Sequence, residues 1–136
     1  MKHVKAFAAG FVSTLVFHQG VLALFWTLGM SPRAPYPIQA VPPFGVPQIV
    51  SLAFWGGVWG IAIAHFLRGT AGAAYWGRAI LIGAVALTAV ALAIVFPLKE
   101  MPFMAGWDPK IIVFGLILNG AWGLGLALFL RLSNRL

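Results

Sequence analysis

Four long apolar runs that contain no charged residue are the dominant feature of this sequence. They cover residues 6–28, 49–67, 79–97 and 111–130, and none of them holds Asp, Glu, Lys or Arg. A helix needs about 20 apolar residues to cross the roughly 30 Å hydrocarbon core of a bilayer. The runs therefore predict an all-α, polytopic membrane protein in which residues 1–136 form one domain, a bundle of four transmembrane helices.

The composition supports the lipid bilayer as the surroundings of this chain. Charged residues make up 8% of the sequence, apolar residues make up 62%, and the mean hydropathy is +0.98. A soluble domain carries about 25% charged residues. The net charge of +7 comes from single basic residues at the ends of the apolar runs, which is typical of membrane anchors. Nucleic acid is therefore not an expected partner.

The basic residues are divided unevenly between the two sides of the predicted bundle. The side of the termini holds six of them: Lys2, Lys5, Arg68, Arg78, Arg131 and Arg135. The other side holds Arg33, Lys99 and Lys110, together with both acids, Glu100 and Asp108. Lys and Arg accumulate on the cytoplasmic side of membrane proteins. We therefore expect both termini in the cytoplasm.

An internal repeat relates the second apolar run to the fourth. Residues 57–68 read GVWGIAIAHFLR and residues 120–131 read GAWGLGLALFLR, so seven of twelve positions are identical at an offset of 63 residues. A repeat unit of two helices preserves orientation across the membrane. The repeat therefore predicts two parallel helical hairpins, in which the second and fourth helices are equivalent about an axis along the membrane normal.

Small residues form one face of each repeated helix. These positions are Gly57, Gly60 and Ala64 in the second helix, and Gly120, Gly123 and Ala127 in the fourth. The third helix adds Ala79, Gly83 and Ala86. Small residues at helical spacing allow two backbones to approach closely. They indicate either an interface between copies of the chain or packing inside one bundle, and we favour internal packing for at least one face.

Four polar residues fall near the predicted middle of the membrane: His18, Gln19, Thr88 and Asn119. Such groups cost a few kcal/mol in hydrocarbon unless they are paired. We expect them to face one another, with His18 bonded to Asn119 or Thr88. They could form a solute site or a proton relay, or they could make hydrogen bonds between helices. The second interpretation is favoured because no acidic residue completes a proton path.

Catalysis and cofactors find little support in the sequence. Cysteine is absent, histidine occurs three times, and both acids lie in one loop. His18 and His65 differ in predicted depth by about 10 Å at 1.5 Å per helical residue, too much for two axial ligands of one haem iron. We therefore expect no enzymatic activity, no cofactor and no metal site.

The segment between the first two apolar runs is unusually rich in proline. Residues 31–48 read SPRAPYPIQAVPPFGVPQ, with six prolines beside Tyr36 and Phe44. Proline restricts the backbone and stiffens a loop. The segment is expected to be either a stiff lid or docking strip on the outer face, or a plain solvated linker.

Three strings in the first half of the chain carry a resemblance. They are FHQGVLALFW (residues 17–26), PPFGVPQ (42–48) and SLAFWGGVWG (51–60). Over roughly residues 2–68 the sequence resembles a group of small bacterial inner-membrane proteins of unknown function. The resemblance implies four helices and a bacterial cytoplasmic membrane, and it brings no activity with it. Small multidrug-resistance transporters, in contrast, need a Glu in the first helix, which is missing here.

Two functions remain open at this point. The favoured one is a non-catalytic accessory or scaffold subunit that acts through helix packing and the proline-rich outer loop, with a second copy or another membrane protein as its partner. The alternative is an oligomeric channel or transporter for a small solute or ion, with a site formed by His18, Gln19 and Asn119.

Overall fold

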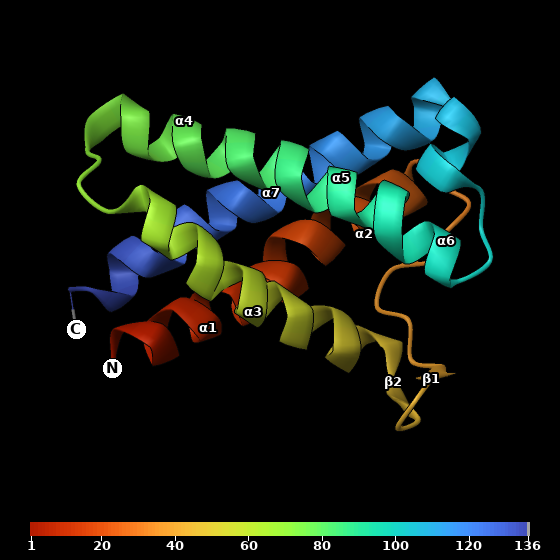
Figure 1. Cartoon of the computed structure of the whole chain (residues 1–136), viewed down its shortest axis with the longest axis horizontal. Helices are drawn as coiled ribbons and strands as arrows, with labels where there is room; N and C mark the ends of the chain where they lie inside the picture. The colour runs from red at the N-terminus through yellow and green to blue at the C-terminus, as the bar shows by residue number, and fades with distance from the viewer. Residues whose placement is uncertain (136) are drawn as a thin grey trace.

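The computed structural model describes residues 1–135 and is all-α, as predicted (Figure 1). Its four helices that are long and apolar enough to cross a membrane cover Lys2–Thr27, Gln48–Leu67, Gly72–Leu98 and Pro109–Ser133. The chain runs back and forth, so that the N-terminus and the last described residues lie at one end of the bundle. We call this the terminal end, and the opposite end, which carries residues 28–47 and 99–108, the loop end.

Two of the four spans are interrupted by π-helical turns. The first span consists of α1 (Lys2–Ser13), a π-turn (Thr14–His18) and α2 (Gln19–Thr27). The third consists of α4 (Gly72–Ile82), α5 (Thr88–Val90) and α6 (Phe96–Leu98), joined by π-turns at Gly83–Leu87 and Ala91–Val95. The second and fourth spans are the single helices α3 (Gln48–Leu67) and α7 (Pro109–Ser133). A π-turn inserts an extra residue, so the side chains after it point to a different face.

The third span begins at Gly72, well before the predicted start at residue 79. The prediction began the apolar run after the charge of Arg78, which in the structure lies inside α4 and is exposed. A long basic side chain near a helix end can keep its stem in the apolar region while its charged head reaches water. The link between the two hairpins is therefore only the few residues between Leu67 and Gly72.

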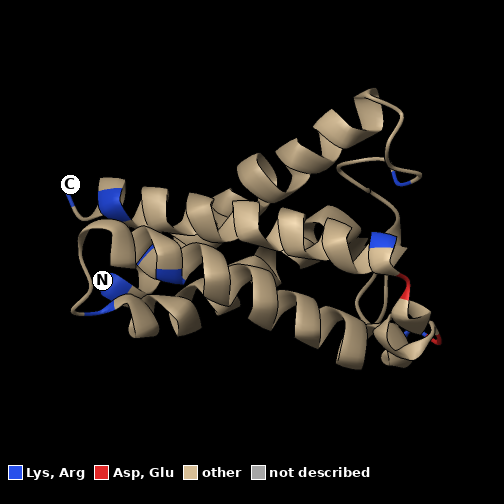
Figure 2. Cartoon of the chain, turned by 90° about the horizontal axis from the view of Figure 1, so that it is seen from above, with Lys and Arg blue, Asp and Glu red and all other residues tan. Residues whose placement is uncertain are grey.

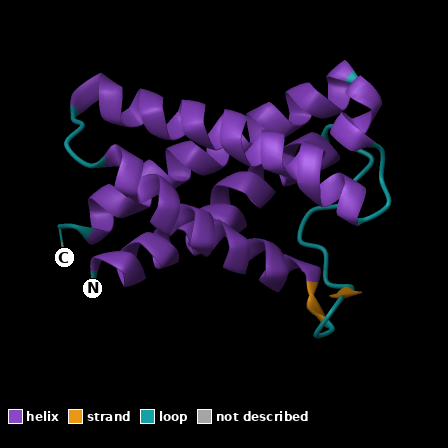
Figure 3. Cartoon of the chain, viewed as in Figure 1, coloured by secondary structure: helices purple, strands orange, loops and turns teal. Residues whose placement is uncertain are grey.

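The link between α2 and α3 is ordered and folds into a small antiparallel hairpin (Figure 3). Its strands are β1 (Ala40–Val41) and β2 (Val46–Pro47). The link between α6 and α7 contains a short turn at Phe103–Trp107, in which Met104 and Ala105 have φ of 52° and 53°, in the left-handed region. Asp108 then caps α7 by accepting a hydrogen bond from the Lys110 backbone N–H (2.9 Å).

The two hairpins pack their helices in the same way. A Cβ atom added to Gly10 in α1 would collide with the Gly56 carbonyl and lie 3.0 Å from the Gly60 Cα. A Cβ added to Gly83 would lie 2.9 Å from the Asn119 carbonyl oxygen and 3.1 Å from the Gly123 Cα. Asn119 and Gly123 are the repeat counterparts of Gly56 and Gly60. The first span therefore corresponds to the third, a match that the sequence did not reveal, at an offset of 73 residues.

The two seams between the hairpins differ from each other. The first span packs closely along α7, and the buried side chains of Ile63, Ala79, Trp122 and Leu126 form the core around this contact. In contrast, α3 touches the third span mainly at α4, next to their short link, and the two diverge toward the loop end (Figure 1). The predicted equivalence therefore holds within each hairpin, while the relation between the hairpins is not symmetric.

Charge divides the bundle along its length. Lys and Arg gather at the terminal end, whereas both acids lie at the loop end among the remaining basic residues (Figure 2). Apolar surface separates the two ends, as expected for a chain whose middle faces lipid.

Candidate functional site

The candidate site lies where the proline-rich loop meets the first span. Gln19 follows the π-turn directly and its side chain is buried, with 1% exposed. Its Nε2 lies 3.0 Å from His18 Nδ1 and donates to it in the tautomer that leaves Nδ1 unprotonated. Its Oε1 accepts a hydrogen bond from the Tyr36 backbone N–H at 2.7 Å. The Gln19 amide therefore joins the first span to the loop.

Further contacts fix the loop in this position. The Tyr36 hydroxyl donates to the Leu15 carbonyl oxygen, in the π-turn, at 2.7 Å. Arg33 lies over the Phe96 ring of α6, with its Cζ 5.9 Å from the ring centroid. Near the hairpin, the Ile49 N–H donates to the Pro37 carbonyl oxygen at 2.8 Å. The loop is thus held by contacts to three of the four spans, while most of its residues are exposed.

The other two polar residues form a separate pair. Asn119 Nδ2 donates to Thr88 Oγ1 at 2.9 Å, and both residues are buried. This bond joins the third span to α7 within the second hairpin. The prediction that His18 bonds to Asn119 or Thr88 is therefore wrong, because the loop supplies the partner of the Gln19–His18 pair. The predicted cluster of four is two separate pairs.

The faces of small residues are used inside the chain. A Cβ on Gly57 would lie 2.5 Å from the Phe7 ring, and a Cβ on Gly60 would lie 2.5 Å from the Ala6 carbonyl oxygen. In the other hairpin, Gly120 packs near Ile80 and Gly123 packs against the Ala79 backbone. Ala127 is fully buried, and Ala64 is partly buried against the core. These faces are therefore packed inside each hairpin.

Two hydrogen bonds between the hairpins were not predicted from the sequence. The Ser13 hydroxyl donates to the Trp122 carbonyl oxygen at 2.6 Å, and Trp122 Nε1 donates to the Gly10 carbonyl oxygen at 3.1 Å. Both contacts are buried, and Trp122 is 1% exposed. The sequence repeat marks Trp122 through its match with Trp59, whereas the match of Ser13 with Ala86, which has no hydroxyl, depends on the offset of 73 residues that only the structure reveals. The Ser13–Trp122 hydrogen bond therefore has no counterpart between Ala86 and Trp59.

Two surface recesses bear on the transport interpretation. One lies at the terminal end between α1, α3, α4 and α7, and the other lies at the start of α7 around Phe114. Neither recess is lined by His18 or Gln19. The contacts at the candidate site are hydrogen bonds, which are suited to holding a loop in place.

Comparison of the chain with models of protein families, with curated proteins and with solved structures found no match. The resemblance to small bacterial inner-membrane proteins therefore stays a prediction. The class that the fold itself defines is a multi-pass, all-α protein with four helices able to cross a membrane.

Proposed function

We propose that this protein is a non-catalytic accessory membrane protein whose proline-rich loop, residues 31–48, binds another integral membrane protein at the loop end. The observation that carries the proposal is the use of the buried Gln19 amide. Both of its polar atoms are occupied, one by His18 and one by the Tyr36 backbone N–H. This pairing supports a role of Gln19 in holding the loop in one conformation.

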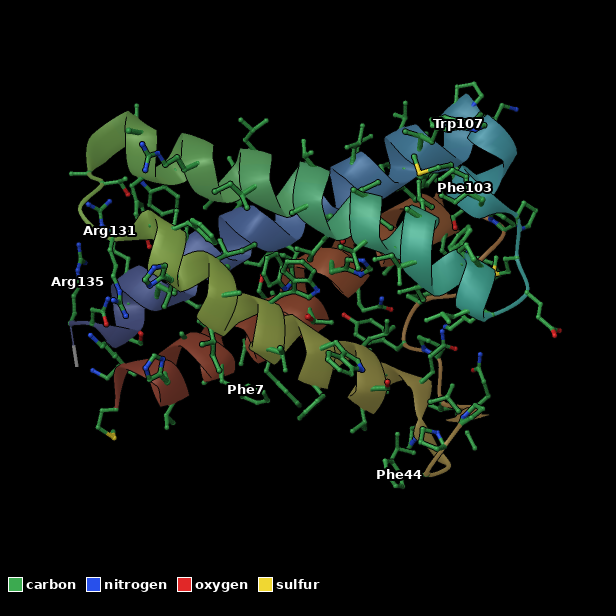
Figure 4. All side chains as sticks on the ribbon, in the orientation of Figure 1. Phe7, Phe44, Phe103, Trp107, Arg131 and Arg135 are labelled. Carbon is green, nitrogen blue, oxygen red and sulfur yellow. The ribbon has the colours of Figure 1, made fainter. Side chains whose placement is uncertain are left out.

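The fixed loop presents apolar side chains that no other part of residues 1–135 covers. Ile38 is 78% exposed, and Phe44, at the tip of the β1–β2 hairpin, is 87% exposed. Phe44, Phe103 and Trp107 all lie at the end opposite Arg131 and Arg135 (Figure 4). A surface ordered before binding loses less conformational entropy when a partner docks. Exposed aromatic side chains on a stiff loop are suited to contact with a partner protein.

The location and orientation are part of the same proposal. The gathering of Lys and Arg at the terminal end supports a cytoplasmic position for both termini. The loop end then faces the periplasm, if the membrane is the bacterial inner membrane that the resemblance implies. The partner is expected to expose its own segment on that side.

Photocrosslinking from the hairpin tip tests this proposal. A benzophenone amino acid in place of Phe44 should form one discrete adduct with a second membrane protein in cells. Gln19→Leu replaces the amide with an apolar side chain of similar volume and removes the acceptor of the Tyr36 N–H. Because a buried hydrogen bond contributes about 1 kcal/mol, the adduct yield should fall about fivefold in this variant. The same crosslinker at Val85, which is 53% exposed in the third span, serves as the lipid-facing control.

Three results would count against the proposal. An adduct of equal yield in the Gln19→Leu variant would show that the fixed loop is not needed. Crosslinking from residue 44 as diffuse as that from residue 85 would show that the tip faces lipid. An adduct made of two copies of this chain would replace the proposed partner by self-association.

One observation favours the alternative of an oligomeric channel or transporter. His18 is the last residue of a π-turn in the first span, and such turns are frequent at functional sites. In that case His18→Gln should alter solute flux or its pH dependence in proteoliposomes, since imidazole can take a proton and an amide cannot. Under the accessory function the same variant leaves flux at the background level.

A further inference from the structure

The recess at the terminal end has a strongly basic lining. Its volume is about 200 Å³, and it lies between both hairpins. Its polar lining consists of Lys2, His3, His65, Arg68, Tyr75 and Asn134. No Asp or Glu lines it, because both acids of the chain, Glu100 and Asp108, are at the loop end. Among residues 1–135, the recess therefore concentrates basic groups without an acidic side chain to balance them.

The equivalent place in the second hairpin is built differently. There Arg131 lies over two aromatic rings, with its Cζ 5.5 Å from the centroid of Tyr75 and 5.6 Å from that of Trp76. A guanidinium is stabilised by the negative face of an aromatic ring. Arg131 thus has aromatic partners, Tyr75 and Trp76, within the second hairpin.

The first hairpin replaces this partner with more positive charge. Arg68 is the counterpart of Arg131 at the offset of 63 residues. Lys2 and His3 are the counterparts of Tyr75 and Trp76 at the offset of 73 that relates Gly10 to Gly83. Where one hairpin places an arginine on two rings, the other gathers an arginine, a lysine and a histidine around a recess. The positive charges of Lys2 and Arg68 repel each other unless an anion lies between them.

We propose that this recess binds the phosphate of an anionic lipid headgroup. Lys2 and Arg68 supply the charges, and Asn134 and the two histidines supply additional N–H donors. Arg and Lys pair strongly with phosphate oxygens. The recess lies at the end of the spans, at the level of the lipid headgroups. Basic pockets between membrane helices on the cytoplasmic side bind anionic lipids. The site is at the opposite end from the proline-rich loop, so it does not depend on the proposed partner.

Native mass spectrometry of the detergent-solubilised protein tests the proposal. The probes are dioleoyl phosphatidylglycerol, dioleoyl phosphatidylcholine and inorganic phosphate. The wild type should bind phosphatidylglycerol about tenfold more tightly than phosphatidylcholine, since each basic residue near an anionic headgroup adds about a fewfold in affinity. The double variant Lys2→Gln/Arg68→Gln should lose this preference. Arg131→Gln, the matched control in the second hairpin, should keep it.

The remaining outcomes overturn the proposal. Equal binding of the two lipids, or an equal loss in Arg131→Gln, would show that general surface charge and not the recess is responsible. Binding of inorganic phosphate as strong as that of phosphatidylglycerol, and lost in the double variant, would assign the recess to a soluble phosphate. The side chains of Lys2, Arg68 and Arg131 are exposed, so we expect the wild type and both variants to be equally stable. Melting curves of the three proteins check this.

Discussion

Replacing Gly123 with alanine is expected to lower the free energy of unfolding by about 2 kcal/mol, within the usual range for overpacking. The added Cβ would collide with the Ala79 carbonyl group, which is backbone and cannot rotate away. The third span and α7 would have to separate along their whole contact. Gly60→Ala should lower the free energy of unfolding by a similar amount, because its Cβ would lie 2.5 Å from the Ala6 carbonyl oxygen. Unfolding in mixed micelles of mild detergent and dodecyl sulfate measures the effect.

Gly77→Ala is the matched control for these variants. Gly77 lies in α4, and a Cβ there would meet nothing within 4 Å. Alanine is a better helix former than glycine by about 1 kcal/mol, so this variant should be as stable as the wild type or more so. If Gly123→Ala and Gly77→Ala unfold alike, the close backbone contact within the hairpin does not exist.

Trp122→Ala is expected to cost about 3 kcal/mol, at the lower end of the range for removing a buried aromatic side chain. The indole is 1% exposed and fills the contact between the hairpins, and its Nε1 bonds to the Gly10 carbonyl oxygen. The lower end applies because lipid and not water surrounds the helices, so lost packing outweighs lost transfer energy. The same mixed-micelle titration gives the value.

Trp59→Ala supplies the comparison within the repeat. Trp59 holds the same place in the GxWG pattern but is only partly buried, and among the described residues its indole makes no hydrogen bond. Its loss should cost about 1 kcal/mol, in keeping with a partly exposed site. Equal effects of the two substitutions would mean that the two seams between the hairpins are the same, against the asymmetry described above.

The architecture could be predicted because lipid imposes strong rules on sequence. Within lipid, the backbone N–H and C=O groups of a long apolar run can all be paired inside that run only if it forms a helix. The repeat of Trp59 with Trp122 and of Arg68 with Arg131 indicated the two hairpins. The correspondence of the first span with the third could not be predicted. This correspondence rests on the pairs Ala6–Gly10 and Ala79–Gly83. Two small residues four positions apart are too common in apolar sequences to indicate a repeat.

The sequence indicated His18 and Gln19 as candidate site residues, but it did not predict their hydrogen-bond partners. Position along a helix follows from a rise of 1.5 Å per residue, so the depth of His18 could be approximated. The direction of a side chain around the helix is set by local geometry, and the π-turn Thr14–His18 changes it. The folding of the loop back onto the first span depends on the Tyr36 backbone N–H, which no side-chain pattern records.

Hydrogen exchange of the Tyr36 backbone amide, in protein reconstituted into lipid nanodiscs, tests the central claim most directly. The claim is that the Gln19 amide holds the proline-rich loop against the first span through the 2.7 Å bond from the Tyr36 N–H. The account predicts slow exchange in the wild type and exchange about fivefold to tenfold faster in Gln19→Leu, as loss of a hydrogen bond of about 1 kcal/mol requires. Fast exchange in the wild type, or the same rate in both proteins, would contradict it.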